Sequence, residues 1–317
     1  MQPPTFADVL FARQTIAPYL RPTPLYHYQS LGDEVGAEVW IKHENHNPTG
    51  AFKVRGGVNF MAHLPPEAKA RGVITASTGN HGQSVAYAAR LFGVRAIIAM
   101  PNGANPVKVE AIRNFGAEIH FVGQDFDDCR KYVEETSERE GMHYLSSGDE
   151  PLLIAGVGTY SLEILEARPD VNTLIVPLGG GSGAAGACLV AKTLNPDIHV
   201  IAVQSEAAPA AYLSWKEGRR IEAKSETFAE GLATRAPFDL PQSILRRYLD
   251  DFVLVSEEEL KAAMRLAIEK TRNLVEGAGA ASLAAAHKLR DRLGGQRVAL
   301  VMSGGNATLA GLKELLA

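Results

Sequence analysis

Short apolar runs rich in β-branched residues alternate with helical patterns along this chain, and this alternation constrains the fold more than any other feature. The runs cover residues 39–42, 73–76, 96–100, 118–122, 173–177, 200–204 and 298–302. Uninterrupted apolar runs are typical of parallel strands that are buried on both faces and covered by crossover helices. We therefore expect an α/β fold in which open, mostly parallel sheets are flanked by helices.

Two proline-containing turns, at residues 64–66 and 150–151, divide the chain. A residue that precedes proline is pushed out of the helical region, so helices tend to end there. The segment between the turns holds three successive strand–helix patterns, which is enough for a compact lobe. We expect two lobes, a small one formed by residues 67–149 and a large one formed by residues 1–66 and 150–317.

The amino-acid composition limits the kinds of molecule that the protein is expected to bind. The formal net charge is −4 and lysine and arginine are scattered, which gives no reason to expect nucleic acid binding. No apolar run reaches the roughly 18 residues of a membrane span, and residues 6–20 lack the pattern of a secretion signal. The two cysteines, Cys129 and Cys188, have no metal-ligand spacing. We expect a cytoplasmic protein with a small-molecule partner and no membrane contact.

A glycine-rich loop follows one of the apolar runs and precedes an alanine-rich helical pattern. It comprises Gly179, Gly180, Gly181, Ser182 and Gly183. Glycines let backbone N–H groups turn inward without obstruction by Cβ, and the N-terminus of the following helix adds partial positive charge. We expect the loop to bind a phosphate group, although an ordinary tight turn is the plainer interpretation.

The same segment also contains the spacing Gly181-x-Gly183-x-x-Gly186, with Glu206 twenty residues after the last glycine. In a nicotinamide-dependent dehydrogenase such glycines face a pyrophosphate, and the acidic residue binds a ribose hydroxyl. A dehydrogenase is therefore an alternative, but it leaves the other conspicuous segments of the chain unexplained.

Lys53 stands in a segment rich in turn residues. Pro48 and Gly50 precede it, and Gly56 and Gly57 follow it, so the backbone is shaped closely around Phe52 and Lys53. A single lysine is usually exposed and needs no special explanation. A lysine that is partly removed from water has a lowered pKa, which imine chemistry and proton abstraction require. We expect Lys53 to be such a lysine.

Polar residues follow the run at 73–76 and open a helical pattern. They are Ser77, Thr78, Gly79, Asn80 and His81. Serine, threonine and asparagine at a helix start often only cap the helix. In combination with a phosphate loop and a reactive lysine, the free N–H groups of this turn instead suggest a site for the carboxylate of a substrate.

The last apolar run ends at Ser303, which precedes two glycines and Asn306. Ligands of open α/β sheets gather at such strand ends. The hydroxyl of Ser303 is expected either to satisfy local backbone groups or to hydrogen-bond the ring nitrogen of a bound pyridine cofactor. A serine cannot keep that nitrogen protonated as an acidic residue would.

Together these segments resemble the serine/threonine dehydratase and serine racemase family, which uses pyridoxal phosphate and shares fold type II with tryptophan synthase β and cysteine synthase. The resemblance implies that Lys53 carries the cofactor, that Phe52 flanks its ring and that the loop at 179–183 binds its phosphate. It further implies that Asn80 contacts the phenolic oxygen and that Ser303 partners the pyridine nitrogen.

The resemblance also assigns roles to the two lobes. Residues 67–149 would form a mobile substrate-binding domain, with the turn at 77–81 as its substrate loop, and the remainder would form the cofactor-binding domain. His81 favours dehydratases, because cysteine synthases typically carry threonine there. Enzymes of this fold type are usually dimeric, so we expect a homodimer.

Departures from the family pattern bear on the reaction. Thr78 stands where serine racemases have a serine that acts as the second base, and its extra methyl crowds the hydroxyl. Gln204 and Ala210 replace carboxylates of the racemase cation site, so we predict no metal site. Gly148 stands where racemases often have asparagine. The chain also ends soon after Asn306, which leaves no room for the regulatory domain of biosynthetic threonine dehydratases.

These features predict a pyridoxal phosphate-dependent ammonia-lyase, or dehydratase. It would remove water from a β-hydroxy-α-amino acid such as threonine or serine and yield a 2-oxo acid and ammonia. Lys53 and Thr78 are the expected catalytic residues, and Lys53 would remove the Cα proton. A racemase, a β-replacement synthase, the nicotinamide-dependent dehydrogenase and a non-catalytic binding protein are the alternatives, and the substrate side chain is left open.

Overall fold

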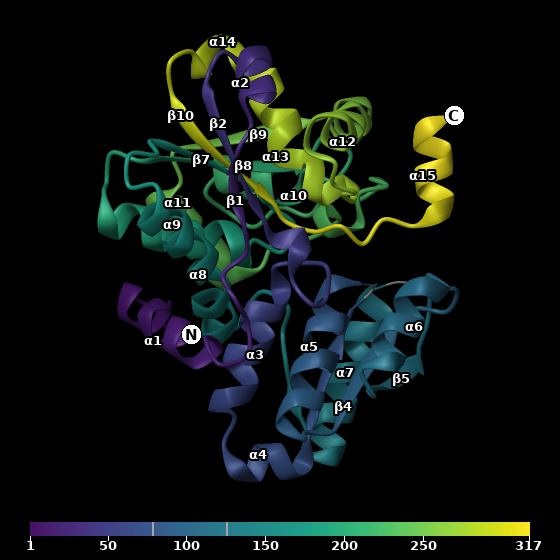
Figure 1. Ribbon diagram of the computed structural model, residues 1–317. Coiled ribbons are helices and arrows are strands. Elements are labelled where there is room, and N and C mark those ends of the chain that lie inside the picture. The colour runs from purple at the N-terminus through teal and green to yellow at the C-terminus, as the bar shows by residue number, and fades with distance from the viewer. Residues whose placement is uncertain (78, 125) are drawn as a thin grey trace.

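The strands form two separate sheets in the computed structural model, which describes residues 1–77, 79–124 and 126–317 (Figure 1). The six-stranded sheet has the order β1-β2-β10-β7-β8-β9 and the four-stranded sheet the order β5-β4-β3-β6. The strands of the six-stranded sheet are, in chain order, β1 (Leu25–His27), β2 (Glu38–His43), β7 (Thr173–Pro177), β8 (His199–Ser205), β9 (Asp251–Val255) and β10 (Arg297–Met302). Those of the four-stranded sheet are β3 (Val73–Ala76), β4 (Ala96–Met100), β5 (Glu118–Phe121) and β6 (His143–Tyr144).

Every neighbouring pair of strands is parallel except β1 and β2. This arrangement confirms the expected α/β fold with two mostly parallel sheets. Figure 1 shows the six-stranded sheet in the upper half of the molecule and the four-stranded sheet in the lower half.

Helices separate the strands along the chain. The first group is α1 (Phe6–Ile16), α2 (Gln29–Val35), η1 (Glu44–His46), α3 (Lys53–His63), α4 (Pro66–Arg71), α5 (Asn80–Phe92), α6 (Pro106–Asn114) and α7 (Phe126–Glu140). The second group is α8 (Pro151–Ala167), α9 (Ser182–Leu194), α10 (Ala210–Lys216), η2 (Glu230–Leu232), α11 (Asp239–Tyr248), α12 (Glu257–Thr271), α13 (Gly277–Lys288), α14 (Arg290–Leu293) and α15 (Leu309–Leu316). No helix of the described ranges combines the length and apolar character needed to cross a bilayer.

Both faces of the six-stranded sheet are buried, which explains its uninterrupted apolar sequences. Leu174 and Val176 of β7 pack in one hydrophobic core with α8, α9 and α11. Ile175, between them, packs in the other core with α12 and α13. Successive side chains of a strand point to opposite faces, so a strand that is covered twice has no solvated position.

Helix α3 joins the core of the small sheet. Its residues Val54, Val58 and Met61 pack in the same hydrophobic cluster as Val73 of β3 and Val85 of α5. The helix precedes residue 67, where the sequence suggested the boundary of the small lobe. Packing therefore makes α3 the structural link between the two sheets.

A cluster of buried charges fixes the start of α3. Arg55 is 1% exposed and its guanidinium lies 2.7 Å from Oε2 of Glu44 and 2.6 Å from Oε1 of Glu163. Lys42 also donates to Glu163, and Thr23 donates to Glu44. Buried charges are tolerated when they are paired and hydrogen-bonded, as these are. The cluster therefore ties η1 and α8 to the first turn of α3.

Replacing Arg55 by methionine is expected to lower the free energy of unfolding by about 3–5 kcal/mol, because Glu44 would remain buried without the guanidinium that balances its charge. Urea denaturation measures this change. Arg95→Met is the matched control, since the Arg95 guanidinium binds Glu118 at 2.7 Å and both side chains are about half exposed. It should cost no more than about 1 kcal/mol. Equal losses in the two variants would contradict a special role for the buried cluster.

Candidate active site

Lys53 lies at the first residue of α3, beside the carboxyl end of β10. The backbone N–H of Phe52 donates to the carbonyl of Ser303 at 3.0 Å, and Ala51 forms an isolated bridge with Gly304. These contacts join the lysine segment to the strand end that the sequence suggested as a cofactor site. The predicted residues Phe52, Lys53 and Ser303 are thus brought together by the backbone.

The amine of Lys53 is buried and points to the glycine loop. Its Nζ donates to Oγ of Ser182 at 2.9 Å and to the carbonyl of Ser147 at 3.2 Å. Burial lowers the pKa of Lys53 to about 8, because the ammonium form is poorly solvated there. Nζ also lies 5.4 Å from the centroid of the Phe52 ring. Near neutral pH, a lysine with this pKa has a far larger neutral fraction than an ordinary lysine, and the neutral form is the one that acts as a base or nucleophile.

The glycine loop joins β7 to α9, and its backbone leaves little room for side chains. A Cβ on Gly179 would lie 2.1 Å from the carbonyl oxygen of Gly231. Gly181 has φ +89°, a conformation that favours glycine, and it caps α9 directly before Ser182. The first N–H groups of a helix have no partner within the helix, so this turn presents donors to an anion.

The acidic residue of the dinucleotide-binding pattern, Glu206, is engaged elsewhere in the structure. The carboxylate of Glu206 accepts from Nζ of Lys288 at 3.3 Å. Gly186 packs against α8, where a Cβ would lie 2.8 Å from Cα of Gly158. Lys53 reaches the first residue of α9, where a pyrophosphate would have to bind. The structure therefore assigns these residues to packing, to a surface ion pair and to the lysine site.

The substrate loop predicted at 77–81 opens α5. Oγ of Ser77 accepts from the N–H groups of Gly79 at 3.2 Å and Gly82 at 2.8 Å. Nε2 of His81 lies 3.1 Å from Oγ1 of Thr75, and burial together with the nearby Lys53 lowers the pKa of His81 to about 3. His81 is therefore neutral. Thr78, a predicted catalytic residue, lies outside the described residues.

Ser303 is nearly buried at the end of β10, and its hydroxyl donates to the carbonyl of Ala278 at 3.3 Å. The hydroxyl oxygen is then still able to accept, and the weak bond to Ala278 is one that a ligand can replace. The contact is compatible with both roles that the sequence suggested for Ser303, namely satisfying local backbone groups and hydrogen-bonding the ring nitrogen of a cofactor. Ser303 and Lys53 nevertheless belong to one site, because their segments are hydrogen-bonded to each other.

Glu276 and Asn306 were not predicted as site residues, yet both bind Asn80. Nδ2 of Asn80 donates to Oε1 of Glu276 at 2.5 Å, and Nδ2 of Asn306 donates to Oδ1 of Asn80 at 2.8 Å. Glu276 is the N-cap residue directly before the alanine-rich segment at 277–286, which by sequence is typical of an ordinary buried helix. Only the folded structure shows that its carboxylate meets Asn80, the first residue of α5.

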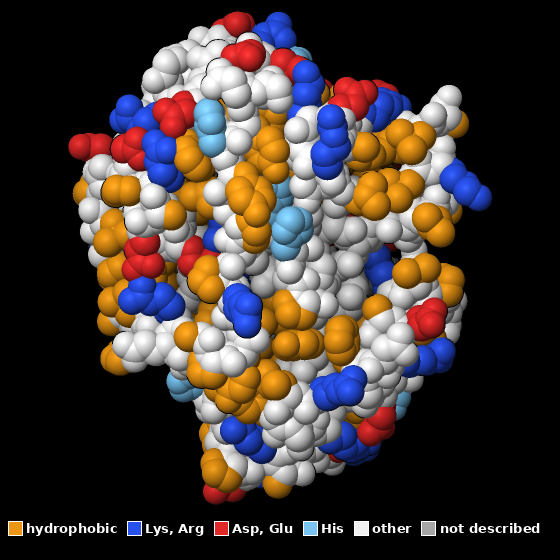
Figure 2. All heavy atoms as spheres, in the orientation of Figure 1, with side chains coloured by type: hydrophobic (Ala, Val, Ile, Leu, Met, Phe, Trp, Pro, Cys, Tyr) orange, Lys and Arg blue, Asp and Glu red, His pale blue; other side chains and the backbone are white. Residues whose placement is uncertain are grey.

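A second unpredicted contact, between the parts of the chain built on the two sheets, is the ion pair of Lys108 with Glu230. Lys108 comes from α6 and Glu230 from η2, and the two line a cavity of about 370 Å³ together with Glu276 and Asn306. Figure 2 shows the surface hollowed between the two halves on the right, where α6 faces α15. The cavity therefore shares Glu276 and Asn306 with the group of side chains that bind Asn80.

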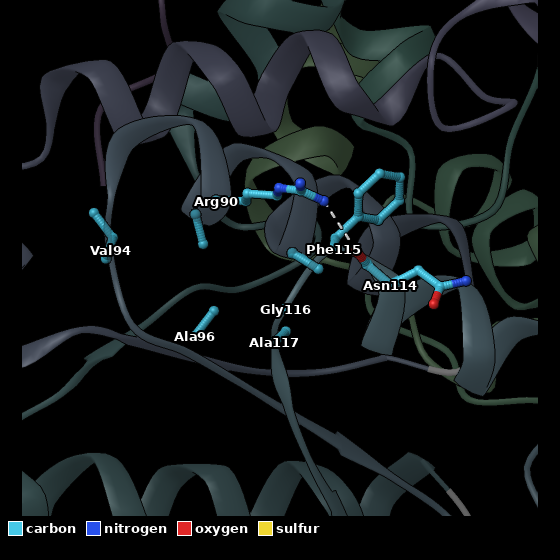
Figure 3. Close-up of a pocket in the computed structure, with 9 residues that line it drawn as sticks. Arg90, Val94, Ala96, Asn114, Phe115, Gly116 and Ala117 are labelled. Carbon is cyan, nitrogen blue, oxygen red and sulfur yellow. Dashed lines mark hydrogen bonds between the residues drawn. The ribbon is translucent and has the colours of Figure 1, made fainter.

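Another cavity, of about 410 Å³, lies between α5, the start of β4 and the end of α6, and contains none of the predicted site residues. Ala86, Ala89 and Val94 form part of its apolar wall, and Arg90 donates to the carbonyl of Asn114 at 3.0 Å at its edge (Figure 3). It has neither a reactive side chain nor a contact to Lys53, so we assign the chemistry to the lysine site.

Phe238 forms a wall of the lysine site that the sequence did not indicate. A Cβ on Gly148 would lie 2.3 Å from Cγ of its ring, and one on Gly180 would lie 3.2 Å from Cε2. The ring therefore spans from the turn after Ser147 to the glycine loop. The N–H of Leu240 donates to Oδ1 of Asp149 at 2.8 Å, which holds the start of α11 against this turn. Gly148 was noted as a departure from the racemases, and Phe238 supplies the physical reason for glycine there.

Gly148→Ala is expected to lower the free energy of unfolding by about 1–3 kcal/mol, because the new methyl group overlaps the Phe238 ring. In a Phe238→Ala background the same change should cost less than about 0.5 kcal/mol, since the obstruction is gone. Denaturation of the four proteins gives this double-mutant cycle. Additive effects of the two substitutions would show that the ring does not exclude a side chain at position 148.

The comparisons with known proteins agree with this geometry. The family model described as "Pyridoxal-phosphate dependent enzyme" matches residues 16–304. The chain is 39% identical to an L-threonine ammonia-lyase of Thermotoga maritima, over 95% of this chain and 75% of that protein. It is 41% identical to an L-threonine ammonia-lyase of Geobacter sulfurreducens, over 90% of this chain and 72% of that protein.

Solved structures give the same result for the fold. The processed form of threonine deaminase isoform 2 from Solanum lycopersicum superposes with a TM-score of 0.93 and 29% identity, over 99% of this chain and 94% of that one. The serine racemase of Dictyostelium discoideum superposes with a TM-score of 0.91 and 32% identity, over 96% of this chain and 99% of that one. The expected fold type II is thereby confirmed.

The residues around Lys53 fit the cofactor of this family. A buried amine with a lowered pKa ends 2.9 Å from Ser182, at the first turn of α9, and the Gly179 backbone is too closely packed to carry a side chain. Backbone N–H groups rather than cationic side chains would receive the phosphate at this turn. With the family model covering most of its length, the chain belongs to the pyridoxal-phosphate dependent enzymes.

Proposed function

We propose that the protein is an ammonia-lyase that removes water from L-threonine or L-serine and releases a 2-oxo acid and ammonia. The observation that carries this proposal is the Lys53 amine, buried with a pKa of about 8 and held between Ser182 and the Ser147 carbonyl. The names of the relatives from Thermotoga maritima and Geobacter sulfurreducens support the choice of threonine. A racemase or a β-replacement synthase would use the same cofactor and is the alternative to test.

When bound, pyridoxal phosphate supplies the electron-withdrawing group that makes loss of the substrate Cα proton possible. Lys53 is the residue that would hold the cofactor and then remove this proton as a neutral amine. After the amine has released the cofactor and before it removes the proton, the hydroxyl of Ser182 and the Ser147 carbonyl would keep it in position. His81 is neutral and bonded to Thr75, so it offers the cofactor no positive charge.

We propose the roles implied by the family resemblance for the other residues predicted from the sequence. The loop at 179–183 would bind the cofactor phosphate, Ser303 the pyridine nitrogen and Asn80 the phenolic oxygen, while Phe52 would flank the ring. Ser77, Thr78, Gly79, Asn80 and His81 form the proposed site for the substrate carboxylate. The start of α5 supports this assignment: Ser77 accepts the N–H of Gly82, but the N–H groups of Asn80 and His81, the first two of the helix, have no partner within it.

The proposed reaction needs no metal ion at the position used by the racemases. Gln204 accepts the N–H of Tyr212 at 3.1 Å and donates to Thr234 at 3.2 Å, so its side chain links β8 to α10. The described residues contain no group of three or more histidine, cysteine, aspartate or glutamate side chains placed to hold an ion. That the metal site is missing stays a prediction of the sequence.

We further propose that residues 67–149 move as a substrate-binding domain relative to the rest of the chain. The contacts of Lys108 with Glu230 and of Asn80 with Glu276 cross the lobe boundary, so an opening motion would break both. A homodimer in the cytoplasm completes the proposal. It rests on the family resemblance, and sedimentation of the purified protein tests the oligomeric state.

Incubation of the wild-type enzyme with L-threonine and L-serine should release 2-oxo acid, which is measured by a coupled reductase assay. Lys53→Ala should lower this rate by about 10²–10⁴-fold, because the base for the Cα proton is lost. Lys313→Ala, an exposed lysine of α15, serves as the control and should keep the wild-type rate. Formation of the D-amino acid without oxo acid would identify a racemase and contradict the proposal.

The pH dependence of cofactor attachment tests the environment of Lys53. Burial disfavours the ammonium form and so lowers the pKa, which means that the neutral, nucleophilic amine accumulates as pH rises through about 8. In the cofactor-free protein, the rate of covalent attachment should therefore rise with pH and level off above this value. The visible absorption band of bound cofactor reports the rate. A rate that keeps rising toward the ordinary lysine pKa of 10.5 would show that Lys53 is solvated.

A further inference from the structure

We propose that Glu276 is a positioning residue which, together with Asn306, fixes the amide of Asn80 so that one N–H of Asn80 is presented to the cofactor. The inference deepens the proposed function and rests on it, because it concerns the same cofactor site. It assigns a task to two residues that neither the sequence motifs nor the comparisons single out.

The orientation of the Asn80 amide follows from a backbone carbonyl. Nδ2 of Asn306 lies 2.9 Å from the carbonyl oxygen of Thr49, which can only accept a hydrogen bond. The atom of Asn306 at this position is therefore the nitrogen. The same nitrogen lies 2.8 Å from Asn80, so the Asn80 atom that faces it must be the acceptor Oδ1. Amide orientations are otherwise ambiguous, and here the chain of partners decides them.

Glu276 completes this arrangement on the other side of the amide. With Oδ1 bound to Asn306, Nδ2 of Asn80 faces Oε1 of Glu276 at 2.5 Å. An amide nitrogen carries two hydrogens, and Glu276 takes one of them. No other described residue accepts a hydrogen bond from this nitrogen. Asn80 therefore holds one N–H in reserve, and an N–H is the group that a phenolic oxygen of the cofactor would accept.

The carboxylate of Glu276 is confined by its surroundings. A Cβ on Gly304 would lie 2.3 Å from its Oε1, and the N–H of Glu276 itself donates to the Gly304 carbonyl at 3.3 Å. Burial raises the pKa of Glu276, while the nearby Lys108 opposes this rise. Burying an acidic group is unfavourable unless it has hydrogen-bond partners. Asn80 is the side chain that provides one.

The contact also connects cofactor binding to the arrangement of the lobes. Asn80 begins α5 beside the four-stranded sheet, whereas Glu276, Asn306 and Thr49 belong to the part built on the six-stranded sheet. The amide is thus held in its orientation only when the lobes are together. An open arrangement would leave Asn80 free to rotate.

The test uses the cofactor-free protein, titrated with pyridoxal phosphate without substrate. Glu276→Met removes the acceptor while keeping a similar volume, and Glu276→Gln keeps an acceptor oxygen without the charge. We expect Glu276→Met to weaken cofactor affinity about tenfold, the effect of one lost charge-assisted hydrogen bond, and to lower the visible absorption band relative to the ultraviolet band. Glu276→Gln should stay within about threefold of the wild type, because its oxygen can still accept from Asn80.

Glu314→Met is the matched control, because Glu314 lines the same 370 Å³ cavity but has no contact with Asn80. It should leave affinity and spectrum unchanged. Asn306→Ala provides a second variant, which removes the donor to Oδ1 and should shift the spectrum in the same direction as Glu276→Met. Thermal unfolding of each cofactor-free variant shows whether the protein is folded.

Wild-type affinity and spectrum in both Glu276→Met and Asn306→Ala would overturn the proposal. Equal losses in Glu276→Gln and Glu276→Met would also overturn it, since they would show that charge and not the orientation of Asn80 matters. Bound cofactor without release of oxo acid would contradict the proposed dehydratase alone. A wild-type protein that binds no cofactor would overturn both.

Discussion

The joining of α3 to the end of β10 is the constraint on which the site depends. The Phe52 N–H binds the Ser303 carbonyl, and Ala51 pairs with Gly304, so the helix that carries Lys53 must begin at this strand end. From there the lysine side chain reaches the first residue of α9. Three segments that are far apart in sequence thus meet because two backbone contacts fix where one helix starts.

The two basic side chains at the start of α3 respond differently to the loss of solvent. Lys53 loses solvation by burial, and a lysine that is buried alone favours its neutral form. Two residues further along the helix, Arg55 is also buried but remains charged, because Glu44 and Glu163 surround its guanidinium. The same helix therefore carries one cation that is paired with carboxylates and one amine whose partners, Ser182 and the Ser147 carbonyl, are uncharged. The lowered pKa of Lys53 provides a neutral amine for the reaction, and the ion pairs of Arg55 hold the start of the helix in place.

Much of the fold was predictable because the buried parallel strands are uninterrupted apolar runs. All seven predicted runs lie on strands, with the fourth ending at Phe121. Strands β1, β6 and β9 were missed. β1 and β9 are edge strands with partly exposed residues, and β6 has only two residues, so none of them shows a fully buried pattern.

Likewise, some residues of the site could be predicted from short segments of sequence, whereas others are recognised only from their tertiary contacts. The glycine loop, the lysine turn and the Ser303 strand end each carry their chemistry within a few consecutive residues. Glu276, Asn306 and Phe238 do not, because their roles arise from contacts between segments about 60 to more than 200 residues apart in the chain. Gly148 was the one hint, as an unexplained glycine whose missing side chain makes room for Phe238.

The central claim is that Lys53 holds the cofactor, and the location of the covalent bond tests it most directly. Reduction of the holoenzyme with borohydride makes the bond permanent, and peptide mass spectrometry then identifies the modified lysine. Our account predicts that the modification lies on the peptide that contains Lys53. A modification on another lysine, above all the buried Lys108 at the lobe boundary, with Lys53 unmodified, would contradict it.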